Sequence, residues 1–454
     1  MILVLFITGS GRGVETQAQK PERASAPSEK RYTLEELQED FKRLRSVVEN
    51  NYSMFFAEKE EISTIFNRRY ALLEEGMSQL EFYRVLSPAV ASLNCGHSNV
   101  LLSRAYEQQI KSETALLPLE VTVLNQKLHV VESKGSEHIP PGSEILSING
   151  IPSPEMLKTI YNSVSSDGAN RTRISRIIDN QFSFLYHTLI DESEPFTVRY
   201  QLPETSDKQS DNSPKTKTKT LQGVSFSQLW GRNHRIVSIG VLLDMEKIKT
   251  DYAAKIFDNY ATLSVGSFIL NQKDYSSFLE EFFITLEERS IKKLVIDLRG
   301  NWGGTPKPAA LLLSYLSSEP VRYFNSEAPF YMFNYKKLQK PKKHAFSGTV
   351  YVLMDGSGFS TTSHFISLLK HHGIATLIGE ETGGSASCSD GKRKIVLPNT
   401  DLRVYYSTRV FTTAVDGFTP GEGINPDYNI KPTAKDIAAG RDPAAEFAAK
   451  LADN

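Results

Sequence analysis

The chain has 454 residues, of which 40% are hydrophobic and 10% aromatic, so it can form two or three domain cores. Its 52 Lys and Arg residues nearly balance its 53 Asp and Glu residues, and no stretch concentrates basic residues with interleaved aromatic ones. This pattern argues against nucleic acid as a partner. The two cysteines, Cys95 and Cys388, are too few for a disulfide scaffold or a zinc cluster.

The first residues predict export. Residues 1–8 are apolar but far shorter than the ~20 residues of a membrane-spanning helix. A short apolar core followed by small and polar residues is typical of a secretory signal peptide, which we place at residues 1–19. The mature protein would then be periplasmic or secreted, without a membrane span. A frayed cytosolic terminus is the alternative. Residues 20–31 are charged and rich in Pro and Ser, which predicts a flexible lead-in.

Residues 32–105 are predicted to be a small helical region. Thr33 to Glu36 and Ser78 to Glu81 both have the capping-box pattern, in which a hydroxyl and an acid three residues later satisfy each other's backbone N–H. Apolar residues at helical spacing follow each box.

Residues 115–222 have a β pattern. Residues 119–123 and 128–131 alternate with period two, and residues 144–148 form a strand that ends in Asn149-Gly150, a pair that favours a tight hairpin. The run GSEILSING resembles the signature of PDZ domains, and a helical stretch follows at residues 153–164. A plain hairpin is the alternative. Residues 206–220 are polar and charged, and we expect a surface excursion there.

Residues 230–454 alternate strand and helix, which is typical of an α/β core. We expect two kinds of element from the pattern. The strands are 236–242, 262–268, 293–298, 349–354 and 375–378, and the helices are 276–289, 308–316 and 361–372.

A glycine-rich turn follows one of these strands. The run LVIDLRGNWGG, residues 294–304, ends a buried strand in a turn that opens a helix, where backbone N–H groups are free. Such donors suit a developing oxyanion. By itself the turn could equally be a phosphate loop or a plain tight turn, although the Lys of a phosphate loop is absent.

Ser360 lies in a second strand-turn-helix segment, at residues 352–363. A hydroxyl there faces the positive end of the helix dipole, and the N–H of Thr361 can donate to the same oxyanion. Without further context, a serine before a helix is more often an N-cap.

These two segments resemble the C-terminal-processing, or tail-specific, serine peptidases, whose pattern reads IDLRGNxGG. The run GEETGG at residues 379–384 resembles their GExTxG. The resemblance implies an α/β core of the ClpP/crotonase-like kind, with Ser360 as nucleophile. It also implies an oxyanion hole from the N–H of Thr361 and of Gly303 or Gly304, and no metal or cofactor. Thr361, Thr362 and Ser363 depart from the small Ala residues and the Glu of the relatives.

The general base is the point at which the sequence departs most from this family. The Lys expected at position 385 is Ser385, and neither Lys392 nor Lys394 matches the family spacing. The run LNCGHS instead resembles the LxDGHT motif of the tricorn-core branch, which implies His97 as base. A neutral imidazole can take the serine proton near pH 7. Cys95 stands where relatives have Asp.

The resemblance also suggests an acidic member. Glu422, in EGINPD, lies in a stretch similar to the family's ExxGVxPD, with Glu380 and Glu381 as substitutes and an exposed turn carboxylate as the alternative. Cys95 and Cys388 could form one bridge near the site, or remain two separate thiols.

The substrate implied by the resemblance is a polypeptide. It would add as a strand to the PDZ-like edge at Leu117, Pro118 and Leu119, although this loop lacks the usual glycines. The alternative function is a catalytically degenerate binding protein on the same fold, with a lipid or peptide ligand, as in the interphotoreceptor retinoid-binding proteins.

Overall fold

The computed structural model describes residues 30–51, 56–203 and 215–453. The predicted signal peptide of residues 1–19 lies outside the described residues, and so does all but the end of the predicted lead-in, so export stays a prediction. Across the described ranges, no helix is both long enough and apolar enough to cross a membrane.

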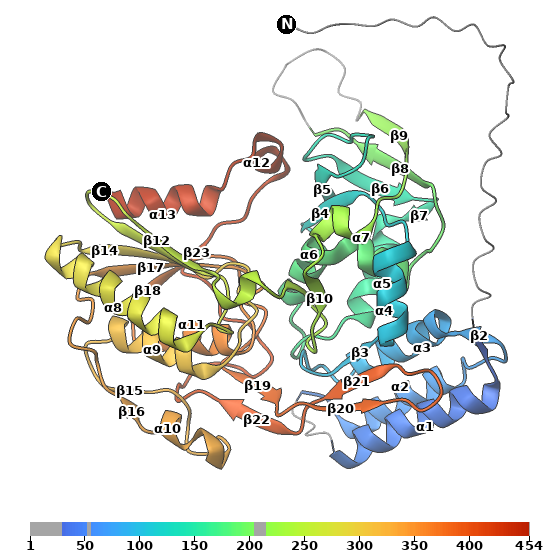
Figure 1. Cartoon of the computed structure of the whole chain (residues 1–454), viewed down its shortest axis with the longest axis horizontal. Coiled ribbons are helices and arrows are strands. Elements are labelled where there is room, and N and C mark those ends of the chain that lie inside the picture. The colour runs from blue at the N-terminus through green and yellow to red at the C-terminus, as the bar shows by residue number, and fades with distance from the viewer. Residues whose placement is uncertain (1–29, 52–55, 204–214, 454) are drawn as a thin grey trace, which may run out of the picture.

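The N-terminal region is helical, as predicted (Figure 1). Its elements are β1 (Arg31–Tyr32), α1 (Leu34–Asn51), α2 (Lys59–Tyr70), β2 (Met77–Ser78), α3 (Gln79–Ala91), β3 (Asn99–Leu101) and α4 (Arg104–Glu113). Both capping boxes are formed: Thr33 N–H donates to Glu36 Oε2 over 2.8 Å, and Ser78 N–H donates to Glu81 Oε2 over 2.7 Å. Local chemistry therefore sets where α1 and α3 begin.

The predicted β region forms one twisted sheet against two helices. The elements are β4 (Leu119–Leu124), β5 (Lys127–Ser133), β6 (Glu144–Ile148), β7 (Ile151–Pro152), α5 (Ser153–Ser163), α6 (Thr172–Leu189), β8 (Phe196–Gln201) and β9 (Thr216–Leu221). Asn149 and Gly150 both have positive φ, 49° and 81°, and turn β6 into β7 as expected.

The expected surface excursion at residues 206–220 is wrong for its last five residues. Residues 216–221 form β9, which pairs antiparallel with β8 along its whole length at the edge of the sheet. Alternating Thr and Lys lack a hydrophobic period, which hid the strand, yet β-branched Thr favours extended backbone and Lys is common on exposed edges. The earlier residues, 204–214, lie outside the described residues.

The C-terminal region is an α/β layer structure (Figure 1). Its sheet has the order β12-β13-β14-β17-β18-β23, parallel except for β12. The strands are β12 (Tyr252–Ile256), β13 (Ala261–Val265), β14 (Lys293–Asp297), β17 (Thr349–Met354), β18 (Ala375–Gly379) and β23 (Tyr428–Asn429). Helices α8 (Gln272–Glu288), α9 (Pro306–Leu316) and α11 (Thr361–His371) cover one face, and α13 (Pro443–Asp453) covers the other. Most predicted elements of this core are confirmed.

One predicted strand of this region is wrong. Residues 236–242 are not a single strand but the turn of a hairpin between β10 (His234–Ile236) and β11 (Leu242–Asp244). Gly240, with φ of +72°, donates its N–H to Val237 O over 2.9 Å and reverses the chain. The apolar run had suggested a buried strand because the turn is itself largely buried.

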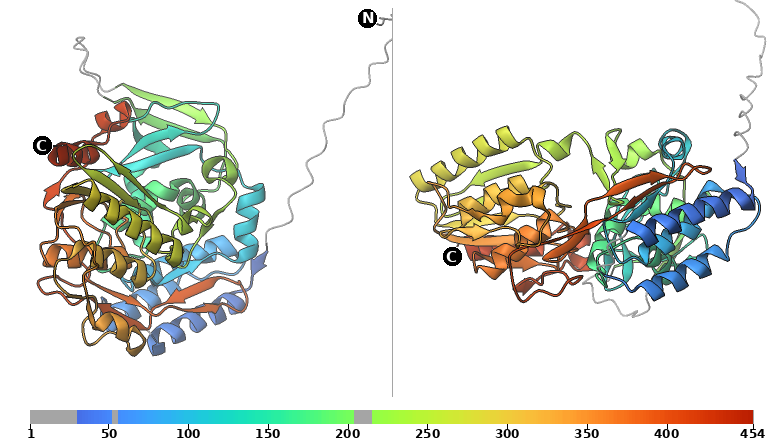
Figure 2. Two further views of the ribbon diagram at one scale, coloured as in Figure 1. Left: turned by 60° about the vertical axis from the view of Figure 1, so that its left-hand side comes forward. Right: turned by 90° about the horizontal axis from the view of Figure 1, so that it is seen from below.

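A long hairpin joins the core to the N-terminal region (Figure 2). It consists of β19 (Ser387–Asp390), β20 (Arg393–Val396), β21 (Arg403–Tyr406) and β22 (Arg409–Thr412), with β19 paired to β22 and β20 to β21. Strand β21 also pairs with β3, two residues after His97, and Thr400 near the tip donates its N–H to the buried Asp40 of α1. The shorter elements are α7 (Phe226–Trp230), η1 (Lys247–Lys249), β15 (Val321–Arg322), η2 (Phe330–Met332), α10 (Phe333–Lys336), β16 (Leu338–Gln339) and α12 (Ala434–Ala439).

Candidate active site

Ser360 occupies the sharp turn between β17 and α11. Its φ of 56° and ψ of −123° are a conformation that a non-glycine residue rarely adopts. Its hydroxyl makes no cap bond to α11, which removes the N-cap explanation. A serine held at a strained strand-to-helix turn, with its side chain free of the helix, has the geometry of a nucleophile elbow.

His97 lies against this hydroxyl. His97 Nε2 is 3.1 Å from Ser360 Oγ, although the two residues are 263 positions apart in the chain. The imidazole is 1% exposed. The structure thus brings the predicted nucleophile and the predicted base into hydrogen-bonding contact, which is the geometry that proton transfer requires.

Long-range contacts hold the His97 loop over the core. Gly96 N–H donates to the buried Asp167 Oδ1 over 2.8 Å, and Gly96 O accepts from Arg173 Nη2 over 3.3 Å. The Arg173 guanidinium lies 4.4 Å from the centre of the Phe359 ring. A Cβ on Gly96 would come within 2.6 Å of that ring, so only glycine allows the loop to approach so closely.

Asp390 is the carboxylate nearest the His97 ring, and the sequence did not single it out. Its Oδ2 lies 3.6 Å from His97 Nε2, and its Oδ1 lies 3.6 Å from Lys392 Nζ. His97 Nδ1 is buried without a hydrogen-bond partner, and the ring packs on Phe359 with centroids 4.6 Å apart. Packing therefore orients the imidazole, while Asp390 supplies a negative charge close to Nε2.

The electrostatics favour a neutral His97. Its pKa is lowered to about 3, chiefly by burial and also by the Lys392 and Arg173 charges, while Asp390 opposes them. Burial pushes the pKa of Asp390 upward, but the His97 and Lys392 charges and hydrogen bonds outweigh this, so the pKa lies below its ordinary value. At neutral pH the pair is an imidazole beside a carboxylate, ready to accept a proton.

The three glutamates proposed from the sequence lie elsewhere. Glu422 is exposed in a turn, Glu380 pairs with Arg176 over 3.3 Å, and Glu381 accepts from Gly423 N–H over 3.0 Å. No hydrogen bond or ion pair joins any of them to His97 within the described ranges. The fold gives Glu380 and Glu381 structural partners, and it places Asp390 where the resemblance suggested Glu422.

The sequence predicts that the family's Ser-Lys dyad is missing, and the geometry likewise shows no lysine bonded to Ser360 in the described part of the chain. Ser385 is buried, and its hydroxyl donates to Ser387 O over 2.6 Å. Lys392 lines the cleft and pairs with Asp390. Lys394 lies on the exposed strand β20 and does not line the cleft. In the described part of the chain, no lysine bonds to the Ser360 hydroxyl.

The glycine turn is fastened to the start of α11. Asn301 Oδ1 accepts from Gly303 N–H over 2.9 Å and from Thr362 Oγ1 over 2.7 Å, while Thr361 Oγ1 donates to Gly304 O over 2.7 Å. A Cβ on Gly303, whose φ is +96°, would lie 3.0 Å from the Ser360 Cβ. The side chains of Thr361 and Thr362, which replace the small Ala residues of the relatives, thus hydrogen-bond the glycine turn to the helix.

These hydrogen bonds show which of the predicted oxyanion donors already has an acceptor. The Gly303 N–H is already used by Asn301. Among the described residues, no acceptor takes the N–H of Gly304 or of Thr361. These two amides therefore fit the oxyanion role better than Gly303, and the assignment stays a prediction.

Ser360 and His97 line a cleft of about 540 Å³ between the core and the N-terminal half. It is large enough for a few residues of a polypeptide. Its walls come from the core, from the β10–β11 hairpin and from the long hairpin: Trp302, Gly303, Ser360, His234, Asp390 and Lys392 are among them. In the described ranges, no three His, Cys, Asp or Glu side chains converge as a metal site would require.

The PDZ-like edge predicted to bind substrate is closed. Leu117, Pro118 and Leu119 are buried, and Ser183 of α6 donates its hydroxyl to Leu117 O over 2.6 Å. Farther along β4, Asp179 Oδ1 accepts from Val123 N–H over 2.9 Å. Side chains of α6 therefore already satisfy the strand edge, so an added peptide strand would have to displace them.

Cys95 and Cys388 are both buried and free. Burial raises the pKa of the Cys95 thiol to about 11, so it is a protonated, unreactive group at neutral pH. Its Sγ lies 3.2 Å from Ser407 Oγ. The structure therefore shows the second of the two alternatives considered for these cysteines.

The fold and the Ser360–His97 pair define the class of protein as a serine peptidase. Residues 259–430 match the model of Peptidase family S41, so the chain carries a peptidase domain of that family. No curated protein matches the chain in sequence. The match contains Ser360, the glycine turn and Asp390, but not His97.

Solved structures that resemble this chain cover nearly all of it. Mature CPAF is similar with a TM-score of 0.62 at 14% identity over 92% of this chain and 96% of that chain. Mature CPAF complexed with lactacystin gives 0.61 at 13% identity over 92% and 97%. The photosystem II D1 C-terminal processing protease gives 0.45 at 14% identity over 90% and 98%. At these identities, the likeness to CPAF is one of fold.

Proposed function

We propose that this serine peptidase cuts polypeptides through an acyl-enzyme formed at Ser360, with His97 as general base. The observation that carries the proposal is the 3.1 Å contact between Ser360 Oγ and His97 Nε2. A strained serine, a neutral imidazole and two amides without acceptors fit one reaction, acyl transfer.

In the proposed mechanism, His97 Nε2 takes the proton of Ser360 as Oγ attacks the scissile carbonyl carbon. The N–H groups of Thr361 and Gly304 bind the resulting oxyanion. The imidazolium lies beside Asp390, 3.6 Å away, which stabilises its charge. It then returns the proton to the leaving amine. Water, deprotonated by the same histidine, hydrolyses the ester and restores Ser360.

We further propose that the core is of the ClpP/crotonase-like kind and that residues 115–222 are a PDZ-like module. Its sheet with two helices and its Asn149–Gly150 turn support this. Because α6 closes the β4 edge, the module would contribute to the site mainly through Asp167 and Arg173, which hold the His97 loop. A free C-terminal peptide that shifted amide resonances of β4 would contradict the closed edge.

We also propose that the protein is periplasmic or secreted, on the sequence of residues 1–19. Recovery of the full chain with Met1 intact from the cytosol alone would contradict export.

The test of the mechanism is a fluorophosphonate probe, which phosphonylates only an activated serine. We expect labelling of the wild type and none of Ser360→Ala. Ser363→Ala is a matched control, because Ser363 lies one turn along α11 and its hydroxyl donates to Ser360 O over 2.8 Å. A folded wild type that is not labelled would favour the degenerate binding protein.

A further inference from the structure

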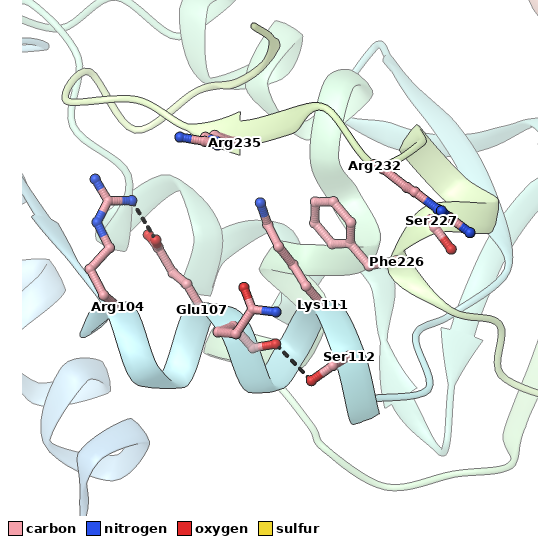
Figure 3. A pocket seen from close by; sticks show the side chains of 9 residues that line it. Arg104, Glu107, Lys111, Ser112, Phe226, Ser227, Arg232 and Arg235 are labelled. Atoms are coloured by element: carbon pink, nitrogen blue, oxygen red, sulfur yellow. Dashed lines mark hydrogen bonds and ion pairs between the residues drawn. The ribbon is translucent and has the colours of Figure 1, made fainter.

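A second large pocket lies away from Ser360, between α4, α7 and β10 (Figure 3). Its volume is about 610 Å³. Arg104 and Lys111 rise from α4, Arg235 lies on the strand opposite, and Arg232 lies beyond Phe226. The pocket thus gathers four cations, and Glu107 is its one carboxylate.

Glu107 offsets only part of this charge. Its Oε2 accepts from Arg104 Nη1 over 3.0 Å, and its Oε1 accepts from the buried Arg403 behind the pocket. Arg232 and Arg235 are exposed, and no described acid pairs with either of them. Since the whole chain has a formal charge of −1, the positive charge is a local feature of this pocket and not of the protein.

Lys111 is held in the centre by neutral groups. Its Nζ donates to His234 O over 2.7 Å and lies 5.1 Å from the centre of the Phe226 ring. Burial lowers its pKa, and the Arg235 and Arg104 charges lower it further against the effect of Glu107. An anion in the pocket would stabilise all of these cations together.

The pocket and the catalytic cleft share a wall. His234, whose carbonyl accepts from Lys111, also lines the cleft that contains Ser360. Strand β10 therefore has the cleft on one side and the basic pocket on the other. Because His234 and Arg235 are consecutive residues, the two cavities adjoin at β10.

We propose that this pocket is an exosite that binds an acidic segment of the polypeptide substrate. Arginine forks match carboxylates bidentately, and the Phe226 ring offers an apolar surface to the methylenes of Glu side chains. The exosite rests on the proposed peptidase function and names its substrate class: polypeptides with acidic residues beside the cleaved segment.

The test measures binding in the full-length Ser360→Ala protein, where no cleavage occurs. The probe is fluorescein-labelled hexaglutamate, followed by fluorescence anisotropy, with hexaglutamine as the uncharged comparison. We expect Arg232→Gln/Arg235→Gln to raise Kd for hexaglutamate by about fivefold or more, since each exposed charge contributes modestly. Arg289→Gln/Lys292→Gln removes the same charge from an exposed site outside the pocket, and we expect it to leave Kd unchanged.

Two results would overturn the exosite outright: equal binding of hexaglutamate and hexaglutamine, or equal weakening of hexaglutamate binding by both double variants. A third would be displacement of hexaglutamate by inorganic phosphate at concentrations far below those at which a neutral salt such as NaCl displaces it by screening. The last would assign the pocket to a free anion. Fluorophosphonate labelling of Arg232→Gln/Arg235→Gln in the active protein keeps the two proposals apart. We expect labelling to stay at the wild-type rate. A wild type that binds hexaglutamate without being labelled would contradict the peptidase function and leave the pocket as a binding site for acidic peptides.

Discussion

The two sides of the active site are built in different ways. Ser360 and the glycine turn lie within residues 259–430, the part that matches the S41 family, and their geometry comes from strand-turn-helix segments close in sequence. His97 lies outside that part. Its loop is held by Asp167, Arg173 and strand β21, all remote in sequence. A nucleophile can therefore be encoded locally, whereas its base depends on tertiary packing.

The long hairpin of residues 387–412 connects the two sides. It carries Asp390 to within 3.6 Å of His97, pairs with β3 just after His97, and reaches Asp40 of α1 near its tip. One element thus sets both the electrostatics of the base and the position of its loop. Single substitutions at His97, Asp390 and Lys392 test how much each side chain contributes to the activation of Ser360.

The largest effect is expected for His97→Ala. Loss of the base should slow fluorophosphonate labelling of Ser360 by about two to four orders of magnitude, while the local geometry of Ser360 and the amides persists. His364→Ala is the matched control, because His364 is also buried, one turn after Ser360. Thermal unfolding checks that both variants fold. If His97→Ala were labelled at the wild-type rate, Ser360 would be activated without His97.

A smaller effect is expected for Asp390→Asn. Removing a charge 3.6 Å from Nε2 should slow labelling roughly tenfold, because the imidazolium loses its stabilising partner. Glu422→Gln is the comparison, and we expect it to leave the rate unchanged. The reverse result would show that Glu422 is the acidic member, as the sequence suggested.

The smallest effect is a shift in pH dependence. His97 acts as a base only when neutral, and its pKa is lowered to about 3, so the acid limb of labelling should lie well below the ordinary value of 6.5. Lys392 contributes to this lowering. Lys392→Met should therefore move the acid limb to higher pH, and Asp390→Asn should move it lower. The measurement is the labelling rate against pH, with Lys394→Met as control. If Lys392→Met and Asp390→Asn shifted the acid limb in the same direction, the charges of these two residues would not be what sets the pKa of His97.

Much of the site was predictable because its parts are local. Capping boxes fixed the starts of α1 and α3, and the turn at Ser360 and the run LNCGHS each stand in a few consecutive residues. The resemblance of these short runs to the peptidase family singled out Ser360 and His97, and the residue pattern alone predicted the alternation of strand and helix in the core.

Other features could not be read in this way. Asp390 has no local motif, and it faces His97 only because β19 and β22 pair in a particular register. Strand β9 has no hydrophobic period, and only its pairing with β8 reveals it. The closed β4 edge depends on Asp179 and Ser183, which come from a helix 56 and 66 residues after their partners.

The sequence by itself, through its resemblance to a family, determined the candidate nucleophile and base, and its local pattern determined the strand-turn-helix segment that presents Ser360. Only the tertiary structure decided which carboxylate lies beside His97, which amides lack an acceptor among the described residues, and that four cations gather on the far side of β10. The physical reason is distance along the chain. Hydrogen bonds between near neighbours leave a pattern in the sequence, whereas contacts between remote segments are fixed by packing of the whole fold.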